Sequence, residues 1–253
     1  MAKLILVANW KNHPASLFEA ESLLKDMAKK RELYKKTNLF IAPPTPYFDA
    51  VVRRAGGFAQ LASQDISLLP KGTYTGEVTP EILKSFGVRL AIVGHSERRA
   101  LGETSSDVAE KAKAALKAGI MPLVCFGERE KDSDGEHFEL LRQELKASLL
   151  GLTKKDMTKV ALAYEPVWAI GKHAQEAIRV EDLSQTVLFV RRVLADLFGR
   201  KEAEKVAILY GGSVEPANAE ILVKGSGVRG LLVGHSSLRA EEFEEITRSI
   251  TGK

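Results

Sequence analysis

The sequence has almost no cysteine and no long apolar segment. Cys125 is the single cysteine in 253 residues, which excludes a disulfide framework and favours a reducing compartment, the cytoplasm. No apolar run approaches the roughly 20 residues that a helix needs to cross a bilayer. The N-terminal run 4–8 also lacks the pattern of a secretory signal. We therefore expect no membrane association.

An excess of charge of one sign is also lacking. Lys and Arg number 37 against 33 Asp and Glu, a formal net charge of +4. This small excess is compatible with an anionic ligand, but it is also typical of ordinary lysine-rich surfaces. The densest basic tract, 29–36, is interrupted by Glu32 and indicates an exposed helix face. We therefore expect no nucleic-acid partner.

Short apolar runs recur along the chain, and most are apolar throughout rather than alternating. This pattern is typical of parallel strands buried on both faces. The eight runs are Leu4–Ala8, Leu39–Ala42, Phe58–Ala62, Leu90–Val93, Pro122–Phe126, Val160–Tyr164, Val206–Tyr210 and Gly230–Val233.

Charged stretches with helical spacing separate most of these runs. They include Leu17–Lys30, Asp107–Ala118, Glu136–Leu150, Glu181–Leu197, Ala217–Lys224 and Ala240–Ile250. Eight strand–helix units in about 250 residues predict an α/β fold, a (β/α)8 TIM barrel that forms a single domain over 1–253. A doubly wound sheet fits less well, because no Gly-x-Gly-x-x-Gly follows the first run. The connections 63–80 and 169–178 are longer than a barrel requires, as lids, binding loops and interface arms often are.

Active sites of such barrels lie at the carboxyl ends of the strands. The residues just past the predicted strands are Asn9, Lys11, His95, Ser96, Glu97 and Glu165, followed by the turns Gly211–Ser213 and Gly234–Ser236.

Glu165 precedes Pro166, which disfavours a helical conformation and holds the carboxylate at the strand end. It is either a base or a charged residue that merely ends a strand. His95 precedes a predicted helix start at Ser96, whose partial positive charge disfavours imidazolium. It is either a hydrogen-bond donor to an oxyanion or a structural histidine.

Lys11 lies two residues beyond Asn9, and an extended step would put both side chains on one side of the chain. Lys11 could then stabilise an oxyanion, form a Schiff base with a substrate, or be an ordinary surface lysine. The glycine-rich turns after strands seven and eight allow close backbone approach, and barrels often bind phosphate there.

Around these residues the sequence resembles the triosephosphate isomerase family. The matching segments keep the family's order and span the chain; they are Ala8–Lys11, Tyr74–Glu77, Val93–Arg99, Ala163–Gly171 and Tyr210–Val214.

The resemblance implies interconversion of dihydroxyacetone phosphate and glyceraldehyde 3-phosphate, a step of glycolysis and gluconeogenesis, without cofactor or metal. It implies Glu165 as the base, Lys11 and His95 as groups that stabilise an enediolate, and Glu97 as a participant in proton movement. Substrate binding would fall to Asn9, Lys11, Gly171, Ser213, Gly234 and His235. Pro166–Trp168 would be the first hinge of a lid.

The family is usually a symmetric dimer, and 63–80 resembles its interface arm, with Thr75 reaching the partner's site. The sequence departs from the family at three places: the lid segment from Lys172 onward is about two residues longer, His235 replaces a glycine, and Asp65 replaces an asparagine.

Rival hypotheses remain open. A barrel with this set could isomerise a related phosphorylated sugar or be a silent phosphate-binding protein. A metal-dependent enzyme would draw on His13, His95, His173 and His235, which lack ligand spacing. A Schiff-base aldolase would use Lys11.

Overall fold

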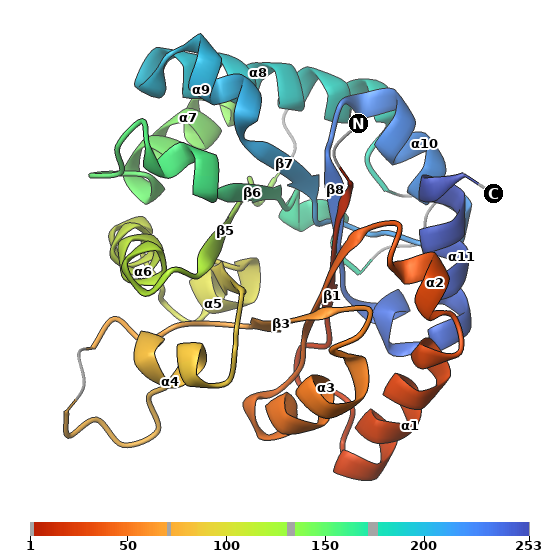
Figure 1. Ribbon diagram of the computed structural model, residues 1–253. Coiled ribbons are helices and arrows are strands. Elements are labelled where there is room, and N and C mark those ends of the chain that lie inside the picture. The colour runs from red at the N-terminus through yellow and green to blue at the C-terminus, as the bar shows by residue number, and fades with distance from the viewer. Residues whose placement is uncertain (1–2, 70–71, 131–134, 172–176, 253) are drawn as a thin grey trace.

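Eight parallel strands close into one barrel in chain order (Figure 1), which confirms the predicted fold class. The computed structural model describes residues 3–69, 72–130, 135–171 and 177–252. The strands are β1 (Ile5–Asn9), β2 (Asn38–Ala42), β3 (Gln60–Ser63), β4 (Leu90–Val93), β5 (Met121–Phe126), β6 (Ala161–Tyr164), β7 (Ala207–Tyr210) and β8 (Gly230–Val233). Ile5 pairs with Asn38 on one side and Gly230 on the other, so β1 closes the barrel.

The predicted strand positions are confirmed to within a residue except at β3. The prediction began at Phe58, whereas the strand begins at Gln60. Phe58 and Ala59 instead close the turn after α3, since both N–H groups donate to Ala55 O at 2.9 and 2.8 Å. Phe58 is apolar because its ring stacks on Tyr34, 5.7 Å away, and not because it belongs to the sheet.

Helices follow the strands and surround the barrel. They are α1 (Leu17–Ala28), α2 (Arg31–Tyr34), α3 (Phe48–Ala55), α4 (Pro80–Ser85), α5 (Ser96–Ala100), α6 (Ser105–Ala118), α7 (Glu136–Ser148), α8 (Val180–Phe198), α9 (Arg200–Lys205), α10 (Pro216–Ser226) and α11 (Ala240–Thr251).

Local signals set several helix ends. Ser16 Oγ accepts the Glu19 N–H at 3.2 Å and starts α1. A capping box between Thr104 and Asp107 starts α6, and Gly119 ends it in the left-handed conformation. The helices with helical spacing in the sequence are all present, whereas α2, α3, α4, α5 and α9 are too short to show it.

The strands are buried on both faces, which explains their continuous apolar sequence. Val7 and Leu232 belong to the cluster inside the barrel, while Leu6 and Val233 belong to the larger cluster beneath the helices. Because neighbouring strands pair in parallel, the carboxyl ends of all eight lie at the same rim of the barrel.

Within the described residues, no helix is both long and apolar enough to cross a membrane. The connection between β3 and α4 extends away from the barrel (Figure 1).

Candidate active site

A cavity of about 390 Å³ opens at the carboxyl ends of the strands. Most of the predicted site residues line it: Asn9, Lys11, His95, Glu165, Gly171, Ser213, Gly234 and His235. Glu97 is not part of the lining and reaches the site through Lys11. The fold thus brings together residues that β1, β4, β6, β7 and β8 carry at their ends.

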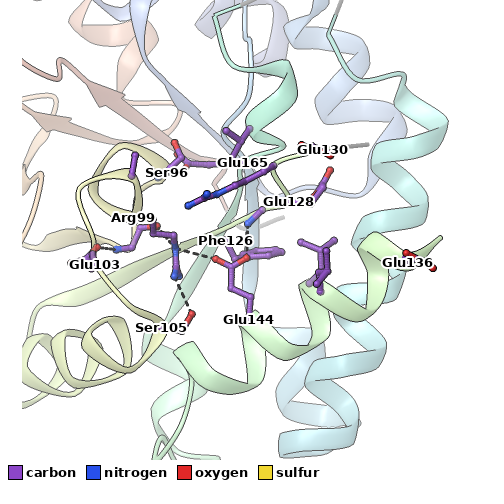
Figure 2. Close-up of a pocket in the computed structure, with 17 residues that line it drawn as sticks. Ser96, Arg99, Glu103, Ser105, Phe126, Glu128, Glu130, Glu136, Glu144 and Glu165 are labelled. Atoms are coloured by element: carbon purple, nitrogen blue, oxygen red, sulfur yellow. Dashed lines mark hydrogen bonds and ion pairs between the residues drawn. The ribbon is translucent and has the colours of Figure 1, made fainter. Parts of the chain in front are cut away.

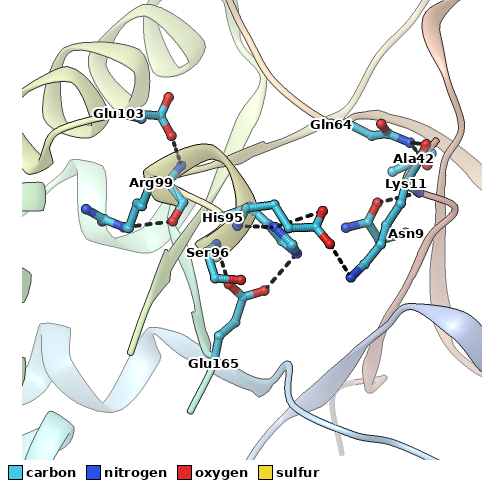
Figure 3. A network of polar contacts seen from close by, with 11 residues as sticks. Asn9, Lys11, Ala42, Gln64, His95, Ser96, Arg99, Glu103 and Glu165 are labelled. Carbon is cyan, nitrogen blue, oxygen red and sulfur yellow. Dashed lines mark hydrogen bonds and ion pairs between the residues drawn. The ribbon is translucent and has the colours of Figure 1, made fainter. Parts of the chain in front are cut away.

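Lys11 enters the site through a turn. Its φ of 52° is left-handed, so the predicted extended step from Asn9 is wrong. Asn9 itself is buried, and its Oδ1 accepts the Lys11 N–H at 3.0 Å. That bond closes a short loop and turns the lysine side chain across the strand ends (Figure 3).

Gln64 fixes the Lys11 backbone and was not predicted. Its Nε2 donates to Lys11 O at 2.7 Å and to Ala42 O at 2.9 Å (Figure 3). Gln64 directly follows β3. The strand-end rule that selected Glu165 is the sequence signal that applies to Gln64 too.

The Lys11 ammonium is paired with a carboxylate. Lys11 Nζ lies 2.6 Å from Glu97 Oε1. Burial alone would raise the pKa of Glu97, but the hydrogen bond and charge of Lys11, with a smaller effect of His95, lower it overall. Glu97 is therefore ionised at neutral pH and forms an ion pair with Lys11.

His95 is buried and caps α5, which begins at Ser96 as predicted. Its Nδ1 accepts the Glu97 N–H at 3.2 Å. An imidazole nitrogen that accepts cannot carry a proton, so the neutral ring carries its proton on Nε2. His95 is thereby prepared to donate a hydrogen bond from Nε2 toward the cavity.

The Glu165 carboxylate is almost fully buried beside His95. Oε2 accepts the Ser96 N–H at 2.9 Å. Oε1 lies 3.1 Å from His95 Nε2, but the N–H direction does not align, and Oε1 has no hydrogen-bond partner in the described part of the chain. Figure 3 shows the carboxylate held between Ser96 and His95. One oxygen is thus anchored by a backbone N–H, and the other is close only to the His95 ring.

Gly211 makes room for this carboxylate. A Cβ there would lie 2.9 Å from Glu165 Cγ and 3.4 Å from Oε1. The glycine turn after β7, which suggested a phosphate site, therefore also leaves space for the Glu165 side chain.

A family model for triosephosphate isomerase matches residues 4–250 of this chain. The chain belongs to the triosephosphate isomerase family. The triosephosphate isomerase of Fusobacterium nucleatum is 38% identical over 254 residues, which cover 98% of this chain and 99% of that protein. That of Citrifermentans bemidjiense is 39% identical with the same coverage, and that of Flavobacterium johnsoniae is 34% identical over 99% of this chain and 100% of that protein.

Glu128, which follows β5, holds the start of the connection after β6, where the sequence predicts a lid. Its Oε1 accepts from Tyr164 OH at 2.8 Å and from Trp168 Nε1 at 2.7 Å. Val167 N–H also donates to Glu128 O at 2.9 Å. The predicted first hinge is therefore tied to the end of β5. The longer lid segment, Lys172 to Glu176, lies outside the described residues.

A second cavity of about 790 Å³ lies behind Glu165, which lines both (Figure 2). Arg99 spans it, since Nε donates to Gly94 O at 2.8 Å and lies 3.0 Å from Glu144 Oε1. Burial raises the pKa of Glu144, and Arg99 opposes that rise. Arg99 thus braces the turn that carries His95, a role that no sequence signal indicates because its partner lies on α7.

Asp65, where the sequence analysis expects a departure from the family, belongs to a charged cluster. Its two oxygens lie 2.6 Å from Lys111 Nζ and 2.9 Å from Arg98 Nη2. Lys111 also contacts Glu103, whose Oε2 accepts the Gly94 N–H at 3.0 Å. Two acids therefore face two bases here.

No three His, Cys, Asp or Glu side chains of the described residues converge as around a metal ion. His173, one of the four histidines in the metal hypothesis, lies outside those residues.

Proposed function

We propose that this chain is a triosephosphate isomerase that interconverts dihydroxyacetone phosphate and D-glyceraldehyde 3-phosphate by proton transfer through an enediolate. The observation that carries the proposal is the convergence of Lys11, His95 and Glu165 on one cavity, with His95 Nε2 only 3.1 Å from Glu165 Oε1. A base, a neutral donor and a cation around one small substrate suit proton abstraction next to a carbonyl.

Glu165 is the proposed base. To reach a carbon-bound proton it leaves the Ser96 N–H and turns into the cavity. The unsatisfied Oε1 supports this movement, because the resting position leaves one oxygen without a hydrogen bond. The same carboxylate then returns the proton to the neighbouring carbon.

Lys11 and His95 are proposed to stabilise the enediolate, with Asn9 holding Lys11 in place. The carbonyl is polarised by an ammonium and an imidazole N–H, so the proposed reaction needs no cofactor. Glu97 Oε1 lies 2.6 Å from Lys11 Nζ, and we propose that Glu97 assists proton movement near His95. A protonated lysine is not nucleophilic, which supports this role over a Schiff base; borohydride trapping with substrate tests that rival.

Gly171, Ser213, Gly234 and His235 are proposed to bind the phosphate end of the substrate. They line the cavity on the side of β7, β8 and the lid. Closure of the lid would exclude water and keep the enediolate from expelling its phosphate.

A steady-state assay with glyceraldehyde 3-phosphate tests the function. Glu165→Gln should lower kcat by on the order of 10³-fold, because a positioned base contributes about 10² to 10⁴. Glu245→Gln, on an exposed face of α11, is the matched control and should keep wild-type activity. A wild-type protein that is folded and inert would refute the proposal.

We also propose a homodimer through loop 63–80 and a location in the cytoplasm. Leu68, Leu69 and Tyr74 of that loop are exposed hydrophobic residues, which supports a partner surface. Thr75 would then reach the partner's site. Light scattering decides the dimer: a monomer at micromolar concentration would contradict it.

A further inference from the structure

Glu144 of α7 lies behind the active site. Together with Glu165 it lines the second cavity, and it is not among the described residues that line the active-site cavity. Its carboxylate is engaged at both oxygens. Oε1 lies 3.0 Å from Arg99 Nε (Figure 2), and Oε2 accepts the Gly127 N–H at 3.2 Å. One side chain from the outer layer of helices therefore reaches two groups near the carboxyl ends of β4 and β5.

Arg99 connects Glu144 to the turn that carries His95. Its Nε donates to Gly94 O at 2.8 Å, and Gly94 directly precedes His95. Its Nη2 donates to Cys125 O in β5 at 3.1 Å. Because the guanidinium is planar and its donors are fixed relative to one another, a partner at Nε sets the orientation of the whole group. Glu144 thus helps to hold Arg99 against both backbone carbonyls.

Gly127 connects Glu144 to the backbone of the proposed base. A Cβ on Gly127 would lie 1.8 Å from Glu165 O, so the turn after β5 and the end of β6 are in direct contact. The next residue, Glu128, accepts from Trp168 Nε1 at 2.7 Å at the start of the predicted lid. The bond from the Gly127 N–H therefore fixes the segment that backs Glu165 and supports the lid.

We propose that Glu144 is a positioning residue for the isomerase reaction, which holds the turn of His95 and the segment behind Glu165 in a fixed relation through Arg99 and the Gly127 N–H. This inference rests on the proposed function and adds to it a residue that does not touch the substrate.

The surroundings of Glu144 favour a geometric role over a contribution to stability. Burial raises the pKa of its carboxyl, which Arg99 and the Gly127 N–H oppose, and the negative charges of Glu128 and Glu165 raise it further. An ion pair in such a place adds little to folding, because the loss of solvation offsets the attraction. The two acceptor oxygens instead define where the two segments lie.

Glu144→Gln tests this role with little change of shape. An amide offers one acceptor oxygen and one NH2 donor, so it cannot accept from both Arg99 Nε and the Gly127 N–H. A misplacement of about 1 Å in a reacting group can cost about 10²-fold in rate, and the loss of one of two ties should lower kcat by about 5- to 50-fold. KM for glyceraldehyde 3-phosphate should stay within about threefold of wild type, because the residues proposed to bind phosphate lie on the side of β7 and β8.

Glu144→Met has a similar volume and removes both acceptors, so its kcat should fall further than that of Glu144→Gln. Calorimetry gives Tm for each variant, and kcat is measured well below it. A role in packing alone predicts the same kcat for both variants, and equal values would overturn the inference. So would a kcat for Glu144→Gln within about twofold of wild type.

Glu139→Gln is the matched control. Glu139 lies on the same helix, is exposed, and pairs at 3.4 Å with Arg142 Nε. An exposed pair of this kind contributes little, so the variant should keep the kcat and KM of wild type.

A measurement without turnover separates this inference from the proposed function. The imidazole proton resonances of His95 are those that disappear in His95→Gln. Glu144→Gln should shift them, because the turn before His95 loses part of its support, whereas Glu139→Gln should leave them in place. Unshifted resonances in Glu144→Gln would refute the inference whether or not the protein is an isomerase. A shift in a protein whose wild type has no turnover would refute the function and leave the link between Glu144 and His95 standing.

Discussion

Gly211→Ala should lower kcat while the protein still folds, because the new methyl group displaces the Glu165 side chain. The new Cβ would lie 2.9 Å from Glu165 Cγ and 3.4 Å from Leu232 Cδ2. Carbon atoms pack best at about 3.5–4.0 Å, so the Glu165 side chain must move by roughly 0.6 to 1 Å.

The magnitude follows from that displacement. A misplacement of about 1 Å in a reacting group can cost about 10²-fold in rate, so kcat should fall by roughly 10- to 100-fold with a smaller change in KM. Overpacking costs about 1 to 3 kcal/mol of unfolding free energy, and each kcal/mol lowers Tm by about 2–4 °C in a chain of this size.

Gly57→Ala is the matched control, because a Cβ there meets no atom within 4 Å. Stopped-flow or steady-state kinetics give kcat for both variants, and calorimetry gives their Tm. The reasoning is wrong if Gly211→Ala, folded as judged by calorimetry, keeps kcat within about twofold of Gly57→Ala.

Three further predictions concern residues around the site. Gln64→Ala removes both hydrogen bonds that fix Lys11 O and Ala42 O, and kcat/KM should fall by about tenfold in steady-state assays; an unchanged value would mean that the Asn9 bond alone positions Lys11. Trp168→Phe removes the Nε1 bond to Glu128 and should change the rate of lid opening, seen as a solvent-viscosity dependence of kcat that differs from wild type. Burial, with the charge of Glu165, raises the pKa of the Cys125 thiol, so little thiolate exists at pH 8 and a disulfide-exchange reagent should label Cys125 only after unfolding; labelling of the native protein would contradict this.

The barrel was predictable because the same signal, a short run of apolar residues, recurs eight times along the chain. Each strand is apolar on both faces, and the Leu90–Val93 and Gly230–Val233 runs coincide with β4 and β8. The error at Phe58 has a local cause: a residue buried under a helix turn has the same composition as one in a strand. Short helices such as α5 show no apolar periodicity in the sequence, although the start of α5 at Ser96 was predicted.

The placement of the site residues followed from the strand-end rule together with the family resemblance. Their contacts did not. The Lys11 turn, the Gln64 bonds and the Arg99–Glu144 pair depend on side chains from distant segments, and no spacing in the sequence encodes such distances. Gly211 illustrates this: the sequence shows a glycine, but only the fold shows that the empty space belongs to Glu165.

The groups proposed for catalysis follow three different strands, and the turns proposed for the phosphate end follow two more. No single strand and its loop carry the whole site, so activity requires β1, β4, β6, β7 and β8 to be in place at once. In refolding experiments, enzymatic activity should therefore report closure of the whole barrel, and it should appear after helical signals that single units can produce.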